Sequence, residues 1–292
     1  MSETFGVVGA GTMGNGIAQV AARAGFQVVM RDVSEDFLAR GMKAIDKSLQ
    51  RDVDKERLTA DEKASIVGLI RTTTDLAELR NAFLVVEAVT EDLNVKTEVF
   101  KSLDGIVNSD SILASNTSSI SITKVGAVTK RPDRVIGMHF MNPVPVMKLV
   151  EIIRGAATSD ETYQSIHALT EKLGKVPLEC HDSPGFISNR VLMPMINEAV
   201  FALYEGVASR ESIDGIMKLG MNHPMGPLTL LDFVGLDTTY YISQIMFEEF
   251  KERRFAAPPL LKRMVLAGWN GRKSGRGFYD YSDPQKPVAQ QL

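Results

Sequence analysis

A glycine-rich segment near the first residues, "GVVGAGTMGNGIAQ", restricts the fold of this chain more than any other feature. Its glycines follow the spacing G-x-G-x-x-G between an apolar, strand-forming run and a helical pattern. In that context they allow a tight turn, close approach of the backbone to a pyrophosphate, and close helix–strand packing. The start of the helix then offers unpaired N–H groups to phosphate oxygens. We therefore expect a dinucleotide cofactor to bind at Gly9, Gly11, Thr12, Met13 and Gly14.

The residue that ends the second predicted strand indicates which cofactor binds. Asp32 follows "QVVMR", about 20 residues after the glycine turn, where a carboxylate bonds the ribose hydroxyls. The same carboxylate repels a 2′-phosphate, so NAD is predicted in preference to NADP. Arg31 stands beside it and is a potential partner for that phosphate, which leaves NADP as an alternative.

The first 180 residues or so alternate short Val- and Ile-rich runs with longer helical patterns. We predict strands at "TFGVVG", "QVVMRD", "FLVVEAV", "SILASN", "RVIGMHF", "MKLVEIIR" and "KVPLEC". Helices are predicted between them, for example over residues 12–24 and 92–103. This alternation predicts a Rossmann-type, doubly wound α/β fold with a mainly parallel sheet. The run "MKLVEIIR" follows "RVIGMHF" after a loop too short for a helical crossover, so these two strands are predicted to pair antiparallel.

The pattern changes near residue 184. We predict a long helix over residues 184–206 that begins at Pro184, with Asp182 or Ser183 as its N-cap. Its apolar residues cover a wide arc, which indicates burial on more than one side. No strand-like alternation of any length follows, so the second half is predicted to be all-helical.

Composition limits the possible classes of function. A length of 292 residues fits about two domains, and we place an NAD-binding domain at 1–184 and a helical substrate and dimerisation domain at 185–292. The net charge of −3 gives no support for nucleic acid or a membrane surface as partner. One cysteine, and four histidines without ligand spacing, predict no metal site. A strand pattern near the first residue leaves no room for a signal peptide, so we expect a cytoplasmic location.

Polar side chains follow three of the predicted strands. Glu91 comes after "LVVEAV", Ser118 after "SILA", and His139 and Asn142 at and after the end of "RVIGM". In an open parallel sheet ligands bind beyond the carboxyl ends of the strands. We therefore expect these side chains at one edge of the sheet, in a binding site.

His139 is the residue of this group that exchanges a proton near neutral pH. An antiparallel return of the chain brings Glu151, on the next strand, towards its imidazole. A carboxylate there fixes the tautomer and stabilises the imidazolium, which suits a general base. The alternative is a buried histidine bonded to the backbone.

Taken together, these segments resemble one enzyme family over nearly the whole length of the chain. The shared segments are "GAGTMGNGIA", "VVEAVTEDLNVK", "ASNTSSISIT", "GMHFMNPVPVMKLVEII", "DSPGFISNR" and "KSGRGFYDY", in this order. The chain is similar to the short, single-function L-3-hydroxyacyl-CoA dehydrogenases. The resemblance implies oxidation of an (S)-3-hydroxyacyl-CoA, of short acyl chain, to the 3-ketoacyl-CoA with NAD, and the reverse.

The resemblance also implies roles for single residues. His139 is the catalytic base and Glu151 orients it, while Ser118 and Asn189 bond the oxygen and thioester region of the substrate. The residues implied to contact the nicotinamide cofactor are Asp32, Glu91, Lys96, Ser118, Asn142 and Lys273.

Coenzyme A needs cations for its phosphates, and one predicted helix offers them. Lys43, Lys47, Arg51 and Lys55 recur every four residues and so share one helical face. Aspartates interleaved with them allow the alternative of a solvated, self-neutralised surface. The resemblance places Ser48 and Lys55 near the coenzyme A moiety.

Two other functions compete with this hypothesis. One is a β-hydroxyacid dehydrogenase acting on a sugar acid, although such enzymes commonly use a catalytic lysine. The other is a non-catalytic, crystallin-like NAD-binding protein. The apolar arc of the 184–206 helix further predicts a homodimer that forms through the helical half.

Overall fold

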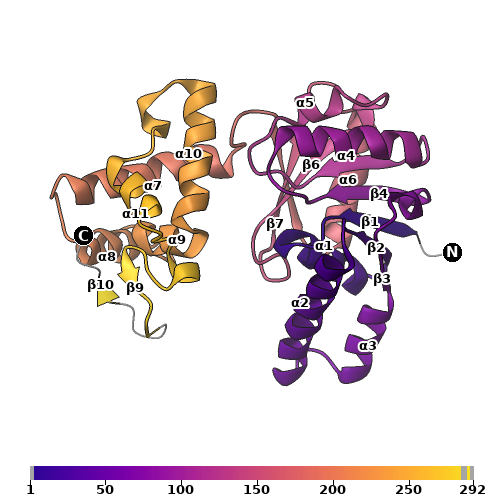
Figure 1. Ribbon diagram of the computed structural model, residues 1–292, viewed down its shortest axis with the longest axis horizontal. Coiled ribbons are helices and arrows are strands. Elements are labelled where there is room, and N and C mark those ends of the chain that lie inside the picture. The colour runs from indigo at the N-terminus through magenta and orange to yellow at the C-terminus, as the bar shows by residue number, and fades with distance from the viewer. Residues whose placement is uncertain (1–2, 284–287, 290–292) are drawn as a thin grey trace. The chain divides into compact units, whose positions relative to one another are not determined.

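A computed structural model describes residues 3–283 and 288–289 of the chain. The residues form two compact units, Met1–Ser183 and Pro184–Leu292 (Figure 1). No helix within these described ranges is long and apolar enough to cross a membrane.

The first unit is built on an eight-stranded sheet. Its strands are β1 (Thr4–Val8), β2 (Gln27–Arg31), β3 (Ile70–Thr73), β4 (Ala82–Glu87), β5 (Ile112–Ser115), β6 (Val135–Phe140), β7 (Leu149–Arg154) and β8 (Val176–His181). They lie in the order β3-β2-β1-β4-β5-β6-β7-β8, and every neighbouring pair is parallel except β6–β7. The predicted Rossmann-type sheet and its antiparallel β6–β7 pair are therefore confirmed. Strand β3, "IRTT", was not predicted, because so short a run shows no apolar pattern.

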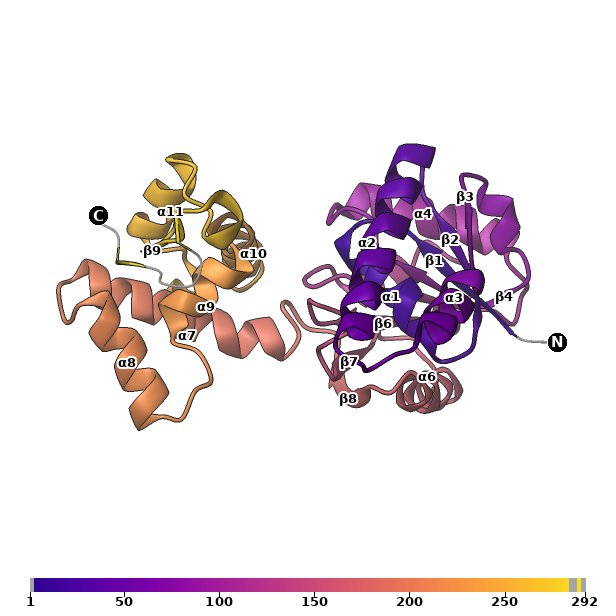
Figure 2. The same ribbon diagram turned by 90° about the horizontal axis from the view of Figure 1, so that it is seen from below.

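Helices cover both faces of this sheet (Figure 2). They are α1 (Thr12–Arg23), α2 (Glu35–Asp54), α3 (Ala60–Gly68), α4 (Leu93–Ile106), α5 (Ile122–Gly126) and α6 (Asp160–Lys172). Residues of α1 and α6, such as Ile17 and Ile166, share one apolar cluster with Val7 of β1. On the other face α5 approaches so closely that a Cβ at Gly137 would lie 3.0 Å from Cγ1 of Ile122. Burial on both faces explains why the strand sequences are almost continuously apolar.

The strand order reverses between β1 and β4. From β1 the chain moves outward to β2 and β3, whereas β5 and β6 follow β4 in the opposite direction. The loops after β1 and β4 therefore diverge, and in doubly wound sheets this opening at the carboxyl edge is where ligands bind. The glycine loop and the residues after Glu87 lie at this opening.

The second unit is helical. It contains α7 (Ser188–Tyr204), α8 (Arg210–Gly220), α9 (Pro227–Val234), α10 (Leu236–Phe250) and α11 (Pro259–Leu266), with a two-stranded pair, β9 (Tyr279–Asp280) and β10 (Val288–Ala289). Ile196 and Val200 of α7 pack in an apolar cluster with Leu231 of α9, Met246 of α10 and Leu261 of α11. Among the described residues of this unit, the short β9–β10 pair departs from the predicted all-helical unit.

The predicted start of the long helix was wrong. Helix α7 begins at Ser188 rather than at Pro184, because Gly185 and Phe186 have φ angles of 74° and 51°. Those values lie in the left-handed region, through which a right-handed helix cannot continue. Asp182 is not its N-cap either: its Oδ2 accepts hydrogen bonds from Ser121 Oγ at 2.6 Å and Thr123 N at 2.8 Å, at the start of α5. The same finding excludes Ser183 as the N-cap, since Ile187 occupies that position.

Two buried aspartates hold the segment of residues 278–281 against the helices. Asp232 of α9 accepts hydrogen bonds from the N–H groups of Phe278 and Tyr279 and from the hydroxyl of Tyr281, at 2.8 to 3.0 Å. Asp214 of α8 accepts one from the hydroxyl of Tyr279 at 2.9 Å. Burial raises the pKa of Asp232 to about 6, although these N–H groups oppose the shift and the charge of Asp214 adds to it.

Candidate active site

The glycine loop, which joins β1 to α1, contains the three glycines of the motif. Of these three, Gly11 is the one that leaves room for a ligand. Gly9 has a φ of 106°, and a Cβ there would lie 2.5 Å from the carbonyl oxygen of Ala88. A Cβ at Gly14 would lie 1.8 Å from the carbonyl oxygen of Gly9. A Cβ at Gly11, the N-cap of α1, would have no protein atom within 4 Å. Space beside a helix N-terminus without a side-chain cap is what a pyrophosphate requires.

Asp32 lies beside this loop, directly after β2. Its Oδ2 accepts a hydrogen bond from Ala10 N at 2.6 Å, and its Oδ1 accepts one from Val33 N at 2.6 Å. The carboxylate is partly exposed and each of its oxygens has a second lone pair for a ribose hydroxyl. Arg31, the residue that left NADP open, instead donates from Nε to the carbonyl of Thr74 at 3.1 Å. Together the glycine loop and Asp32 fit the two phosphates and a ribose of a dinucleotide.

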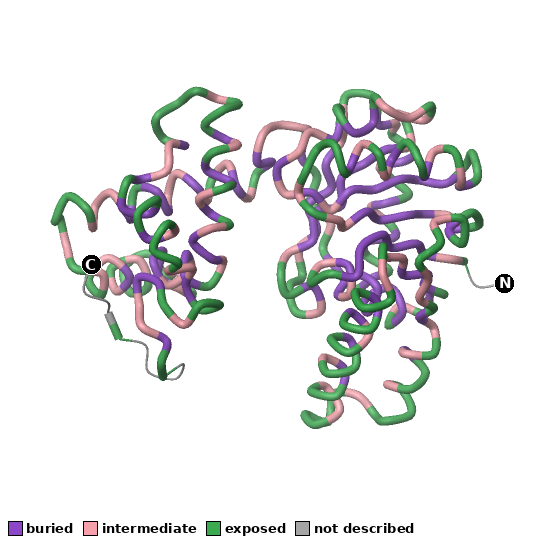
Figure 3. Tube along the Cα trace, in the orientation of Figure 1, coloured by how far each residue is buried: buried purple, intermediate pink, exposed green. Residues whose placement is uncertain are grey.

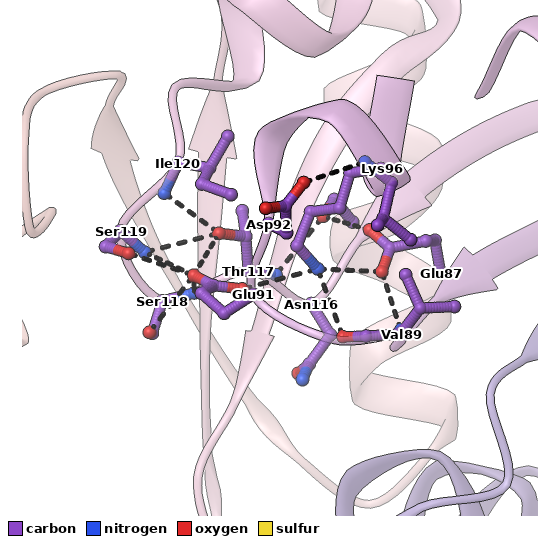
Figure 4. A network of polar contacts seen from close by, with 12 residues as sticks. Glu87, Val89, Glu91, Asp92, Lys96, Asn116, Thr117, Ser118, Ser119 and Ile120 are labelled. Carbon is purple, nitrogen blue, oxygen red and sulfur yellow. Dashed lines mark hydrogen bonds and ion pairs between the residues drawn. The ribbon is translucent and has the colours of Figure 1, made fainter. Parts of the chain in front are cut away.

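The carboxylate of Glu91, after the end of β4, accepts several hydrogen bonds from residues that follow β5 (Figure 4). Its Oε1 accepts from the Thr117 hydroxyl at 2.6 Å, from the backbone N–H groups of Ser118 and Ser119 at 2.9 and 3.1 Å, and from the Ser119 hydroxyl at 2.9 Å. The Ser118 hydroxyl makes the longest of these contacts, at 3.3 Å. Burial acts to raise the pKa of Glu91, but the charge of Lys96 and these hydrogen bonds hold it below the ordinary value.

Lys96 is the cation of this network, and it is almost completely buried. Asp92 caps α4 by accepting a hydrogen bond from Val95 N at 3.0 Å, which places Lys96 in the first turn of the helix. The ammonium lies 2.7 Å from Oε1 of Glu87 and 3.3 Å from Oε2 of Glu91. The side chains of Lys96 and Glu87 are 1% and 0% exposed.

Glu87 is a member of this network that the sequence analysis missed. Besides Lys96, its carboxylate accepts hydrogen bonds from Val89 N and the Ser115 hydroxyl, both at 2.7 Å. Glu87 ends the apolar run of β4, so it was treated as part of the strand. A charged residue inside "LVVEAV" was the available signal, because ionised side chains are buried almost only when they are paired.

His139 and Glu151 face each other across β6 and β7. They are directly paired in the antiparallel register, and Nδ1 of the imidazole lies 2.7 Å from Oε2 of the carboxylate. Both side chains are buried. Because β6 runs parallel to β1, β4 and β5, the end of β6 lies at the same edge of the sheet as the glycine loop and Ser118. Asn142 follows in the loop after β6 and is exposed.

Other predicted site residues lie outside this edge or in the second unit. Ser48 lies in α2 and is partly exposed. Lys55 follows the last residue of α2 as its C-cap and is exposed. Asn189 is in the first turn of α7 and is buried. Lys273 lies in a short 3-10 helix, Arg272–Ser274, where its ammonium is 2.7 Å from Oδ2 of Asp237. Within the described residues no group of three or more His, Cys, Asp or Glu forms a metal site.

Helix α2 is largely exposed (Figure 3). Its aspartates contact residues that do not belong to the basic face of the helix. Asp46 lies 2.6 Å from Lys63 of α3, and Asp52 lies 2.9 Å from Arg23 of α1. Asp54 accepts a hydrogen bond from Gln50 at 2.8 Å. Across the described part of the chain no carboxylate lies within 4.0 Å of the four cations Lys43, Lys47, Arg51 and Lys55. These cations thus have no direct ion pair in the structure, and the choice between a phosphate site and a solvated surface stays a prediction.

Comparison with known proteins gives the same family for both units. The model described as 3-hydroxyacyl-CoA dehydrogenase, NAD binding domain, matches residues 4–183, and that of the C-terminal domain matches residues 185–281. A probable 3-hydroxybutyryl-CoA dehydrogenase of Bacillus subtilis is 55% identical over 95% of this chain and 96% of its own length. The human mitochondrial hydroxyacyl-coenzyme A dehydrogenase is 47% identical over 94% of this chain and 90% of its own.

A solved structure agrees with these sequence matches. The crystal structure of (S)-3-hydroxybutyryl-CoA dehydrogenase from Ralstonia eutropha superposes with a TM-score of 0.92 at 51% identity, covering 97% of this chain and all of that one. The sheet edge that gathers the glycine loop, Ser118 and the His139–Glu151 pair thus belongs to an NAD-dependent oxidoreductase. The chain is a member of the 3-hydroxyacyl-CoA dehydrogenase family.

Proposed function

We propose that the chain interconverts (S)-3-hydroxybutyryl-CoA and acetoacetyl-CoA with NAD as its redox partner. The observation that carries this proposal is the buried His139–Glu151 pair, 2.7 Å apart, at the edge of the sheet that also holds the glycine loop. The short acyl chain is supported by relatives of similar length that are named as 3-hydroxybutyryl-CoA dehydrogenases. Membership of this family does not favour the sugar-acid alternative.

In the oxidation His139 acts as the general base. With Glu151 bonded to Nδ1, the other ring nitrogen, Nε2, takes the proton of the 3-hydroxyl group. As that O–H bond breaks, the C3–O bond becomes a double bond and the hydrogen on C3 leaves with its electron pair. Bound NAD⁺ supplies the acceptor for this hydride. In the reduction the imidazolium returns the proton to the forming alkoxide, and Glu151 balances its charge in both directions.

The remaining predicted residues take binding roles in this proposal. Ser118 and Asn189 bond the substrate oxygen and thioester region. The proposed cofactor contacts are Gly9, Gly11, Thr12, Met13, Gly14, Asp32, Glu91, Ser118, Asn142 and Lys273. Lys96 is proposed to contact the cofactor as well, beside Glu91, whose Oε2 lies 3.3 Å from its ammonium.

The basic face of α2 is proposed to hold the phosphates of coenzyme A, with Ser48 and Lys55 in direct contact. Its support is that, among the described residues, no carboxylate lies within 4.0 Å of these cations, which leaves them available for an anionic ligand. Phosphate groups are favoured ligands for such a cluster because each lysine or arginine makes a charge-assisted hydrogen bond.

A homodimer through the second unit is proposed from its exposed apolar side chains. Ile216 and Leu219 of α8 are 58% and 89% exposed, and Val207, between α7 and α8, is 72% exposed. Large apolar side chains exposed on one segment, here α8 and the turn before it, are typical of a protein interface. The unit of residues 185–292 accordingly serves dimerisation and substrate binding, and that of residues 1–184 binds the cofactor.

A cytoplasmic location is proposed because the chain has a single cysteine, Cys180, which is buried and forms no disulfide. Chains that work in oxidising compartments commonly rely on disulfides. Fractionation of the source cells tests this point.

The function is tested by the reduction of acetoacetyl-CoA with purified protein. We expect NADH oxidation that depends on acetoacetyl-CoA, a higher kcat/KM for C4 than for C16 substrates, and a lower kcat/KM with NADPH. Absence of turnover with normal NADH binding would instead support the non-catalytic, crystallin-like alternative. Turnover with long-chain substrates only would overturn the assignment of substrate length.

A further inference from the structure

Lys175, between α6 and β8, is a buried lysine that the proposed function does not use. The residue is 8% exposed, and no carboxylate among the described residues lies within 4.0 Å of its ammonium. Burial lowers the pKa of Lys175, and the charge of Arg23 lowers it further. Burying a charge without a counter-charge is unfavourable, so the contacts that the ammonium does make indicate what it is there to hold.

The ammonium of Lys175 binds the segment of residues 141–148, which joins β6 to β7. It donates hydrogen bonds to the carbonyl oxygens of Val144 at 2.6 Å and Met147 at 2.8 Å. These carbonyls belong to a turn, in which Met147 N also donates to the carbonyl of Pro143 at 3.0 Å. Hydrogen bonds from a charged donor are stronger than neutral ones. Lys175 therefore fixes the backbone of this turn at two points.

The same segment packs on α1, the helix that begins at the glycine loop. Val144 is buried, and a Cβ at Gly16 of α1 would lie 2.7 Å from the Cβ of Val144. The absence of a side chain at Gly16 thus permits close approach of the segment to the helix. Lys175 holds the segment through its backbone, and α1 holds it through the side chain of Val144.

Asn142 lies in this segment, shortly after His139. The two halves of a doubly wound sheet bind the two nucleotides of a dinucleotide. Asp32 follows β2 in one half, whereas Asn142 follows β6 in the other, next to the proposed general base. The proposed cofactor contact of Asn142 is therefore to the nicotinamide end.

Asn142 is exposed and lies outside the strands, so no strand register fixes its position as it does for His139. A binding residue on an irregular segment needs neighbours that hold the segment still. We propose that Lys175 is a positioning residue: it holds residues 141–148 on α1 and thereby presents Asn142 to the nicotinamide end of the cofactor. This deepens the proposed function, on which it rests through the cofactor role of Asn142.

The variant K175M tests the proposal, because methionine keeps the length of the side chain and removes the ammonium. ADP-ribose is the second ligand, since it has the adenine, riboses and pyrophosphate of NAD but no nicotinamide. We expect the Kd for NADH to rise about fivefold and the Kd for ADP-ribose to stay within about twofold of the wild type. The kcat should fall about tenfold, because the reacting ring is less well placed. The matched control is K148M, which removes an exposed lysine from the same segment and should change none of these quantities.

A double variant tests whether Lys175 acts through Asn142. N142A alone should raise the Kd for NADH about fivefold. K175M/N142A should stay within about twofold of N142A, because the segment then has no amide left to present. Independent roles would multiply the two effects to about 25-fold, which contradicts the proposal.

Two further outcomes would overturn the proposal. One is a folded K175M with the wild-type Kd for NADH. The other is an equal loss of affinity for NADH and ADP-ribose, which indicates general support of the fold. If K175M does not fold, K175Q replaces it and is judged by the same two ligands, because its amide still supplies an N–H donor to the buried carbonyls but lacks the charge and the reach. Both titrations need no turnover, so they remain valid if the assay with acetoacetyl-CoA fails.

Discussion

His139 and Glu151 occupy directly paired positions of two antiparallel strands, so their 2.7 Å contact is set by the backbone register. Neither side chain depends on a loop for its position, and both are buried. A histidine held in this way keeps one tautomer and needs no rearrangement before it accepts a proton. The first prediction therefore concerns the loss of kcat when either of these two residues is replaced.

Replacing His139 by Gln should lower kcat by about 10²- to 10⁴-fold, the usual contribution of a general acid–base group. NADH binding should stay near that of the wild type, because the glycine loop and Asp32 are untouched. Glu151→Gln should cause a smaller loss of kcat, since the imidazolium formed during the oxidation loses its counter-charge. Steady-state kinetics and NADH titration measure both effects, and near-normal turnover of H139Q excludes the proposed base.

Replacement by alanine should have different effects at Gly11 and Gly14: it should weaken cofactor binding at the first and lower the Tm at the second. Gly11 has a φ of −64°, which alanine adopts readily, and its Cβ would enter open space, so G11A should fold with an unchanged Tm. Its Kd for NADH should rise at least about tenfold, because the methyl group occupies the space left for the pyrophosphate. At Gly14 a Cβ would collide with the Gly9 carbonyl, and G14A should lose about 5 °C or more in Tm. Equal cofactor affinity of G11A and the wild type contradicts the assignment of this loop.

The basic face of α2 should act on substrate affinity alone. In R51A/K55A the KM for acetoacetyl-CoA should rise about tenfold, as expected for the loss of charge-assisted hydrogen bonds worth about 1.5 kcal/mol. The kcat should stay within about twofold, and added salt should reduce the difference. K101A, an exposed lysine of α4, is the control. A rise in KM of the same size in K101A argues for a nonspecific charge effect.

Asp232 should make the stability of the second unit depend on pH. Its pKa is raised to about 6 in the folded state, above the value of about 3.9 in an unfolded chain. Its stabilising contribution is therefore complete below about pH 4 and is lost as the pH rises through 6, with a loss of about 1 kcal/mol between pH 5 and pH 7. Urea unfolding followed by the fluorescence of Trp269, the single tryptophan, reports this unit. D232N should be less stable but lack this pH dependence, and parallel curves for D232N and the wild type contradict the prediction.

Leu219 tests the proposed dimer. Placing a charge at this side chain, 89% exposed on α8, should convert the dimer to a monomer in sedimentation at micromolar concentration. L178E, at an exposed position of β8, is the matched control and should leave the dimer intact. A monomeric wild type refutes the dimer, and a dimeric L219E places the interface elsewhere.

The sequence predicted those parts of the fold that depend on local patterns. Seven of the eight sheet strands appear as apolar runs, and the short loop between β6 and β7 was enough to predict their antiparallel pairing. The start of α7 was wrong because Pro184 is typical of a first helical turn, whereas the positive φ angle of Phe186 has no sequence signal. A bulky non-glycine residue adopts that conformation rarely, so no sequence pattern announces it.

Among the site residues, those at strand ends could be predicted because parallel strands deliver them to one edge. For Glu87 the sequence shows only a charge inside an apolar run, and its partners, Lys96 from α4 and Ser115 from β5, do not follow from that signal. Nor did the interleaved charges of α2 show which aspartates pair with α1 and α3. Contacts between elements distant in sequence decide these points, and one sequence carries no direct record of them.

Asp32 has a consequence for attempts to alter cofactor preference. The carboxylate expected to select NAD also accepts a hydrogen bond from Ala10 N, inside the glycine loop. Exchanging it for a residue without an acceptor, such as glycine or alanine, to admit a 2′-phosphate therefore also removes a hydrogen bond that supports the glycine loop. An engineered NADP-dependent form needs a second substitution that restores an acceptor for this N–H group. In this protein the preference for NAD and the geometry of the glycine loop therefore cannot be changed independently.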